Sequence, residues 1–394
     1  MADDATGVVR YGSDLERKGW MINGLVQARS TSFFDGLTGA TMDSIVYQEN
    51  DLSKGAGHEV VFDYDGNLSS KAHVDKEQAF GNSEQKKKFS DKLRVRRLRW
   101  SVDNGDEFDA INIDSLDLTT HEDSRSKLSD LYVRAKDQFL FDAGQGMLAN
   151  VGATHIIRPH NKATIGDLVG ETTPGAKDGD TASYDFMMDV EDIIKTGDGF
   201  TVGDRRRPME PYTLADGTRK WLWIVDSRVA RDIRKSNDFT AIMTGADVRG
   251  NGNRLIKGVI GTIGSLIVIE AQNFFGVSSS KVIGKTEVEV SGLRKLDSNG
   301  FYEGEVGYGA SGAVIASRSL LLGRGALQVG MGKMPDYRWQ PSEDFGIKSE
   351  SALITYMNVQ KTMLLAENED YEDAKVAGYD YGVVCVDTYF RTVA

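Results

Sequence analysis

The hydrophobic pattern of the first third of the chain predicts two strands separated by a long polar stretch. Residues 58–64 alternate apolar and polar side chains, and so do residues 89–102. Such alternation is typical of strands with one buried face. Residues 65–88 carry both signs of charge and have no hydrophobic period. Because a structureless loop of this length is unusual inside a domain, we interpret residues 58–102 as an arm that contacts other copies of the protein.

The return strand of this arm changes face. Its apolar side chains occupy odd positions up to Val95 and even positions from Leu98 onward. Because strand side chains alternate between faces with period two, the switch predicts a bulge or sharp bend near Arg96 and Arg97. A strand break at the edge of a sheet is the alternative.

Three segments have the periodicity of amphipathic helices. The longest spans residues 124–147, where apolar side chains recur at spacings of three and four along one stripe. This stripe consists of Leu128, Leu131, Tyr132, Ala135, Phe139 and Ala143. Shorter helices are predicted over residues 184–195 and 227–236, and Asp226 is placed to cap the second of them.

The rest of the chain mixes strands with one further helix. Residues 220–225 form a continuous apolar run, typical of a strand buried on both faces, and residues 266–269 form another. Strands are also expected within residues 351–365 and 379–393. Over residues 316–329 we predict an apolar helix interrupted by two glycines. Because helices and strands do not alternate as repeated βαβ units, the predicted fold class is α+β.

Composition narrows the classes of function. The chain has 394 residues, a formal net charge of −12 and a single cysteine, Cys385. An acidic chain is not suited to bind nucleic acid as a whole, since phosphate contacts require a positive surface. One cysteine excludes an intrachain disulfide. The sequence has neither a secretory signal nor an apolar run of ~20 residues, so we expect a cytoplasmic protein that does not enter a membrane.

The sequence contains no recognisable catalytic or cofactor-binding motif. Its five histidines form no HExxH or HxH pattern, and His155 with His160 is a weak metal signal. The glycines of residues 258–264 lack the spacing of a dinucleotide loop, and residues 307–312 lack the lysine of a phosphate-binding loop. Cys385 alternates within an apolar strand, which favours a core role. We expect no catalytic residue, no cofactor and no metal.

Three basic clusters remain as candidates for function. They comprise Lys86, Lys87 and Lys88; Arg94, Arg96, Arg97 and Arg99; and Arg205, Arg206 and Arg207. Arginine suits the carboxylates of another subunit because its planar guanidinium donates two parallel hydrogen bonds. We therefore interpret these side chains as candidate contacts between subunits. A solvated surface is the alternative, and direct contact with DNA is less favoured by the net charge.

Several segments, taken in order, resemble the major capsid proteins of tailed phages, and more specifically those of N-four-like phages. The segments are residues 50–62, 83–100, 209–226, 229–234, 258–270 and 319–326. The first two resemble the lead into the family's extended loop and the return from it. The next two resemble the strand and helix that open the A domain, and the last two resemble a strand pair and a late helix. Asp226 and Ser227 stand where the family often has histidine and proline, so the relationship is distant.

The resemblance implies a Hong Kong 97-type capsid fold with an N-terminal arm, an extended two-stranded E-loop, a P domain and an A domain. The implied boundaries are 1–54 for the arm, 55–104 for the E-loop, 105–218 for the P domain with its spine helix at about 124–147, 219–335 for the A domain, and 336–394 for strands that complete both domains. The arm suggested by the hydrophobic pattern coincides with the implied E-loop.

The implied function is that of a major capsid protein of a tailed double-stranded DNA phage. Such a protein assembles through hexamers and pentamers into the icosahedral head shell that encloses the genome. Expected partners are copies of itself, portal, scaffold or decoration proteins, and packaged DNA on the inner face without sequence specificity. The expected location is the virion capsid, and the host cytoplasm during assembly. A tail-tube subunit and an α+β enzyme without a recognisable motif are the alternatives.

Overall fold

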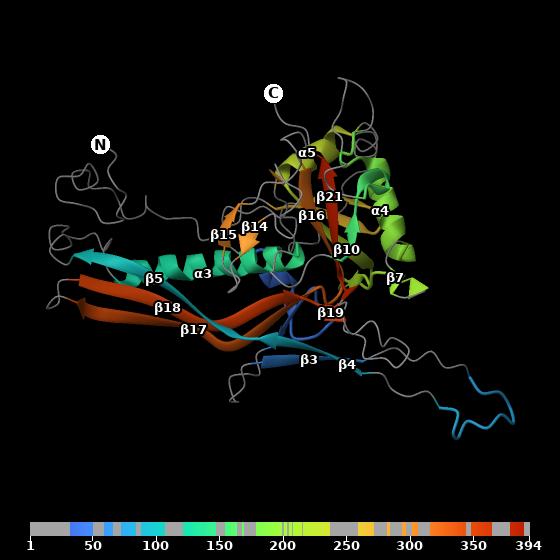
Figure 1. Cartoon of the computed structure of the whole chain (residues 1–394), viewed down its shortest axis with the longest axis horizontal. Helices are drawn as coiled ribbons and strands as arrows, with labels where there is room; N and C mark the ends of the chain where they lie inside the picture. Colours follow the sequence, from blue (N-terminus) through green and yellow to red (C-terminus); the bar gives the residue numbers. More distant parts are fainter. Residues whose placement is uncertain are drawn as a thin grey trace.

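The computed structural model describes residues 32–49, 59–65, 72–83, 88–106, 121–146, 154–163, 168, 179–198, 201–202, 205–206, 208–214, 216–236, 259–271, 282–283, 294–296, 302–305, 316–343, 348–364 and 379–389. Two main β-sheets and a long helix form most of this part of the chain (Figure 1). The predicted α+β class is therefore confirmed.

The first sheet has eight strands. Six follow the order β11-β12-β10-β16-β21-β6, while β9 pairs with β10 and β13 pairs with β16. The strands are β6 (Ile156–Ile157), β9 (Tyr212–Thr213), β10 (Arg219–Val225), β11 (Val259–Ile263), β12 (Leu266–Glu270), β13 (Val282–Ile283), β16 (Ala316–Leu322) and β21 (Val383–Tyr389). The pairs β10–β12 and β21–β6 are parallel. The strands predicted at residues 220–225 and 266–269 are confirmed as β10 and β12.

Strand β10 shows why its sequence is continuously apolar. Trp221, Trp223 and Val225 enter one buried cluster, whereas Leu222 and Ile224 enter a second cluster. Because successive side chains of a strand point to opposite faces, these clusters lie on the two sides of the sheet. Neither face meets water, so every position of this strand requires an apolar side chain.

Helices α4 (Tyr184–Thr196) and α5 (Ser227–Lys235) pack into the cluster that contains the β10 tryptophans. At the start of α4, the Ser183 hydroxyl accepts a hydrogen bond of 3.2 Å from the Phe186 amide. The helix ends at Gly197, whose φ of 70° is readily adopted by glycine. Both helices were predicted from the sequence and are confirmed.

The second sheet has five strands in the order β1-β2-β17-β18-β5. They are β1 (Thr38–Gly39), β2 (Val46–Glu49), β5 (Arg96–Asp106), β17 (Leu327–Glu343) and β18 (Lys348–Lys361). In β18 the odd-numbered residues from 351 to 361 are buried, and the even-numbered residues between them are half-buried. One face of this sheet is therefore covered, and the other is open. Strand β18 confirms the strand predicted within residues 351–365.

Helix α3 (His121–Gly144) lies along the covered face of the second sheet (Figure 1). The ring of Tyr132 meets that of Trp100 in β5 at a centroid distance of 6.0 Å, and its hydroxyl lies 4.0 Å from the Met331 sulfur in β17. The long helix predicted from the sequence is confirmed. On its predicted stripe Leu128, Ala135 and Ala143 are buried and the other members are half-buried.

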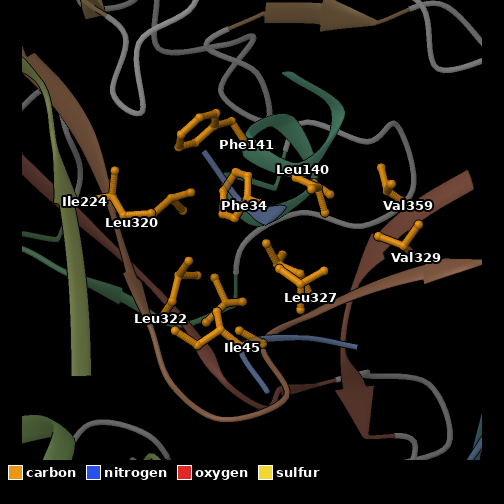
Figure 2. Packing of buried hydrophobic residues seen from close by; sticks show 14 of the residues in the cluster. Phe34, Ile45, Leu140, Phe141, Ile224, Leu320, Leu322, Leu327, Val329 and Val359 are labelled. Carbon is orange, nitrogen blue, oxygen red and sulfur yellow. The ribbon is translucent and has the colours of Figure 1, made fainter. Parts of the chain in front are cut away.

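The last turns of α3 lie in a core shared by both sheets (Figure 2). Leu140 and Phe141 pack there with Phe34, whose ring centroid is 4.9 Å from that of Phe141. Leu320 in β16 and Leu327 in β17 bring one side chain from each sheet to the same cluster. The two sheets are thus joined by apolar packing.

The prediction of a helix over residues 316–329 is wrong, and so is the late helix placed at 319–326. The segment forms β16, a tight turn and the start of β17. Gly325 in the turn has a φ of 58°, and a Cβ on Gly323 would lie 2.3 Å from the Glu210 backbone oxygen. The leucines of β16 are buried on both faces of the sheet. Such a strand has no alternation that distinguishes it from a buried helix.

Short paired strands complete the described part of the chain. They are β3 (Glu59–Asp65) with β4 (Lys88–Arg94), β7 (Thr201–Val202) with β8 (Arg205–Arg206), β14 (Arg294–Leu296) with β15 (Tyr302–Glu305), and β19 (Met363–Leu364) with β20 (Tyr379–Asp380). Single turns of 3-10 helix span Asp35–Leu37 and Pro159–Asn161. Among these described elements, no helix has the length and apolar character needed to cross a membrane.

Candidate assembly surfaces

The predicted two-stranded arm is present as the antiparallel hairpin β3–β4. Its register pairs Val60 with Leu93 and runs out to Asp65 opposite Lys88. Val60 and Leu93 are only 4% and 2% exposed, although the hairpin belongs to neither main sheet. Val61, which follows on the opposite face, is 49% exposed. The hairpin therefore has one packed face and one open face.

A glycine of β17 provides the seat for the packed face. A Cβ on Gly330 would lie 2.9 Å from a Val60 methyl group and 3.0 Å from a Leu93 methyl group. Beside this contact the buried ring of Phe62 meets Tyr47 edge-on, at a centroid distance of 5.1 Å. The base of the arm is thus fixed to its own subunit by shape and apolar packing.

Strands β4 and β5 meet in a bend at Val95. Leu93 packs in the small cluster at the base of the hairpin, whereas Leu98 packs in the core that α3 covers. The side-chain amide of Asn358 donates a hydrogen bond of 2.8 Å to the Arg94 carbonyl and holds the corner. The change of face predicted from the parity is confirmed next to its expected position. It takes the form of a break between β4 and β5, and β5 is an edge strand of the second sheet, as the alternative expected.

One of the three basic clusters lies wholly within the described part of the chain, at the base of the hairpin. Its exposed side chains are those of Arg94, Arg96, Arg97 and Arg99. They lie at the corner of the arm and along β5, which is an outer strand of the second sheet. The register places Arg97 opposite Tyr356 and Arg99 opposite Ile354.

The other two clusters are placed only in part. Lys88 is the first residue of β4, Arg205 and Arg206 form β8, and Lys86, Lys87 and Arg207 lie outside the described residues. Lys88 stands at the opposite end of β4 from Arg94, whereas β8 pairs with β7 and with neither strand of the hairpin. The inter-subunit role of all three clusters stays a prediction.

A buried charged network that the sequence analysis missed ties α3 to the first sheet. Arg318 in β16 is 2% exposed and donates hydrogen bonds of 2.7 and 3.0 Å to the two carboxylate oxygens of Asp387 in β21. Arg158 donates to the same carboxylate at 3.2 Å. The Gln145 side chain, just beyond α3, donates to the Arg318 carbonyl at 3.1 Å. Charged residues inside otherwise apolar strands were the available signal.

A second buried carboxylate fastens the first described residues to α3. Asp137 accepts hydrogen bonds of 2.8 Å from the Ser32 hydroxyl and 2.7 Å from the Phe33 amide. Burial raises the pKa of the Asp137 carboxyl above its ordinary value, and these hydrogen bonds only partly oppose that effect. The segment that leads into β1 and β2 is therefore held by both aromatic packing and a buried acid.

The side chains of His155, His160 and Cys385 have structural surroundings. His155 is buried, which lowers its pKa, and His160 Nδ1 lies 2.8 Å from an Asp180 carboxylate oxygen. Within the ranges that the structure describes, no three His, Cys, Asp or Glu side chains are grouped so as to hold a metal ion. Cys385 is fully buried, and burial raises the pKa of its thiol to about 12. Its predicted core role is confirmed.

Solved phage capsid structures share this fold over nearly the whole chain. The capsid of Ralstonia phage GP4 superposes with a TM-score of 0.65 at 18% identity, covering 98% of this chain and 99% of that chain. The acidic stable capsid of Helicobacter pylori bacteriophage KHP30 gives 0.66 at 12% identity, with 99% of each chain covered. The capsid of Cyanophage Pam1 gives 0.59 at 13% identity, again over 99% of each chain. No curated protein sequence matches the chain.

These similarities confirm the Hong Kong 97-type fold, whereas the more specific resemblance to N-four-like phages stays a prediction. The sequence itself matches a family model described as phage capsid protein over residues 9–392. Because this match covers almost the entire length, the chain belongs to the family of phage capsid proteins.

Proposed function

We propose that this chain, a major capsid protein that forms the head shell of a tailed phage, assembles through hexamers and pentamers with its arm laid across the neighbouring copy. Rings of this kind require heterologous contacts, in which one surface of a copy meets a different surface of the next. The hairpin β3–β4 carries the proposal. It is fixed at its base to its own subunit, and it keeps Val61 exposed on its other face.

We propose that each expected capsid domain corresponds to one group of elements. We propose that the hairpin and its tip form the E-loop, that the second sheet with α3 forms the P domain, and that the first sheet with α4 and α5 forms the A domain. On this assignment, β17 belongs to the P domain and α4 to the A domain. The N-terminal arm leads through the segment that Asp137 fastens to α3.

The protein acts as a structural component of the virion capsid, and copies of itself are its principal partners. We propose that the shell assembles in the host cytoplasm, with portal, scaffold or decoration proteins as further partners. Packaged DNA would lie against the inner face without sequence-specific contacts, since a net charge of −12 opposes tight binding of a polyanion. We propose that the chain has no catalytic activity and requires no cofactor.

Electron microscopy of the purified chain tests the assembly. Closed shells would support the proposal, open tubes would favour a tail-tube subunit, and small uniform particles would favour an enzyme. Deletion of residues 67–86 keeps the pairing of β3 with β4 and removes the tip. We expect a protomer with an unchanged circular dichroism spectrum that does not form shells. Normal shells from this deletion would refute the role of the arm.

Charge reversal tests the role of the basic cluster. Changing Arg96, Arg97 and Arg99 together to glutamate should block assembly more than folding, because these side chains are exposed in the single copy. Loss of the circular dichroism signal would show that they stabilise the subunit itself. Full assembly of the reversed variant would exclude them as contacts.

A further inference from the structure

The tip of the arm, residues 72–83, is ordered without a core of its own and stands away from both sheets (Figure 1, blue, lower right). Two turns are closed by hydrogen bonds from the Glu77 amide to the Val74 carbonyl, at 3.0 Å, and from the Asn82 amide to the Ala79 carbonyl, at 3.2 Å. The Glu77 carboxylate accepts a further bond of 3.1 Å from the Val74 amide. Local hydrogen bonds therefore fix the shape of the tip.

These turns present apolar side chains to water. Phe80 is 90% exposed and Val74 is 61% exposed. Turn formation requires no aromatic residue at position 80, and an exposed ring forfeits the free energy of burial. An aromatic side chain on a preorganised element is typical of the anchors that dominate protein contacts. Lying eight residues before Lys88, Phe80 can reach at most about 29 Å beyond the end of the hairpin.

The open face of the second sheet offers a complementary surface. Ile354 and Tyr356 are half-buried on this face of β18, which is the face opposite to the one that α3 covers. Val95 of the same chain lies near Tyr356, since both side chains border Gly332. Arg99 and Arg97 lie beside Ile354 and Tyr356 in register on β5. Among the described residues, these two guanidinium groups form no hydrogen bond or ion pair. The surface is therefore apolar at its centre and positive along its β5 edge, whereas on the β17 side Asp336, which is ion-paired with Arg338, lies beside Ile354.

The arm and this surface lie on the same side of the second sheet. Gly330 seats the hairpin and pairs in register with Asn358, which belongs to the open face of β18. In a shell built from identical copies, every hairpin therefore lies on the same side of the layer of sheets. A tip that reaches a neighbour arrives at the face to which Ile354 and Tyr356 belong.

We propose that Phe80 anchors the arm to a second copy of this chain by packing against Ile354 and Tyr356 on the open face of that copy's second sheet. The inference rests on the proposed function, because only assembly places a second copy within reach of the tip. It names the anchor and its receiving site, neither of which follows from the presence of an arm alone.

Charge complementarity sets the orientation of this contact. The tip exposes Asp75 and Glu77 close to Phe80 in the sequence, and the receiving surface exposes Arg97 and Arg99. Pairing the two carboxylates with the two guanidinium groups surrounds the aromatic contact with opposite charges. Opposite charges at the edge of an interface favour the correct register more than they add affinity.

Disulfide trapping in assembled shells tests the contact directly. The sole native cysteine, Cys385, is fully buried, so cysteines introduced at the surface should react without background. Shells of the Ala79→Cys, Ala352→Cys double variant, which keeps Phe80, Ile354 and Tyr356, should give covalent dimers and longer oligomers on a non-reducing gel after mild oxidation. The matched control combines Ala79→Cys with Met188→Cys, which replaces a residue of α4 that is 44% exposed, and should give no oligomers.

Equal oligomers from both pairs, or none from shells of the first pair, would overturn the proposal. Failure of the unmodified chain to form shells would instead refute the proposed function. A charge swap gives an independent readout. The Asp75→Lys, Glu77→Lys variant should need a roughly tenfold higher protein concentration for assembly. Adding Arg97→Glu and Arg99→Glu to that variant should return the required concentration to that of the unmodified chain. A swap that restores nothing also overturns the proposal.

Discussion

Replacing Phe62 with alanine tests whether a small apolar cluster holds the arm to its own subunit. The Phe62 side chain is 1% exposed, and its ring lies edge-on to Tyr47 at 5.1 Å. Truncation of a buried phenylalanine costs about 3–5 kcal/mol. Within the described residues only Val60 and Leu93 share full burial with Phe62 in this cluster. Because so small a cluster can partly close the cavity left by the ring, we expect the docked arm to lose about 3 kcal/mol of stability. This corresponds to a roughly hundredfold larger population of undocked arm.

Hydrogen exchange measures that population. A two-stranded hairpin is marginal on its own, so the amides of β3 and β4 should exchange roughly a hundredfold faster in the Phe62→Ala variant, whereas those of β16 and β21 keep their protection. Val61→Ala is the matched control, because Val61 is the preceding residue of the same strand and points to the open face. Equal acceleration in both variants, or loss of protection in β16, would refute the reasoning.

Three other changes probe the seat of the arm and the buried charges. Gly330→Val adds a side chain where a Cβ alone would lie 2.9 Å from the hairpin. It should displace the arm and reduce the yield of shells seen by electron microscopy, with little change in Tm. A full yield of shells would contradict the role of Gly330 in docking the arm. Arg318→Met leaves Asp387 without its bidentate partner and should cost about 3–5 kcal/mol in urea unfolding, whereas a loss below about 1 kcal/mol would contradict the network. The raised pKa of Asp137 means that the folded state holds the proton more tightly than the unfolded state, so stability should fall as pH rises from about 3.9 through the raised pKa. Asp137→Asn should remove this dependence of unfolding free energy on pH. Parallel profiles of stability against pH for the variant and the unmodified chain would contradict the assignment to Asp137.

Sequence patterns predicted the elements that have a clear period. The stripe of α3 runs from Leu128 to Ala143, about four turns, so its helical period is visible. The arm has one packed face, so its strand period is visible too. The parity switch in the return strand also predicted the bend at Val95, because Leu93 and Leu98 enter different clusters. Strand β16 has apolar residues on both faces and therefore lacks a period. Its pairing in register with β21 on one side and β10 on the other shows it to be a strand.

The buried charges could not be predicted for a different reason. Arg318 and Asp387 are 69 residues apart in the sequence, and Asp137 is 104 residues from Phe33, whose backbone amide donates a hydrogen bond to it. Sequence alone does not reveal which distant groups meet, and an arginine in a strand is ordinarily a surface residue. The same limit applies to the Arg94–Arg99 cluster, whose exposure is visible in one copy while its proposed partner belongs to another.

The open face of the second sheet is divided between two uses by its side chains. Where the copy's own hairpin lies, β17 has Gly330, and the missing side chain lets Val60 approach the backbone. Farther along, where the tip of another copy is proposed to lie, β18 has Ile354 and Tyr356, which give an aromatic anchor something to contact. A side chain at the first position would expel the copy's own arm, whereas loss of the side chains at the second would remove the neighbour's site. On the proposed arrangement, the order of small and large residues along one face therefore determines which arm binds where.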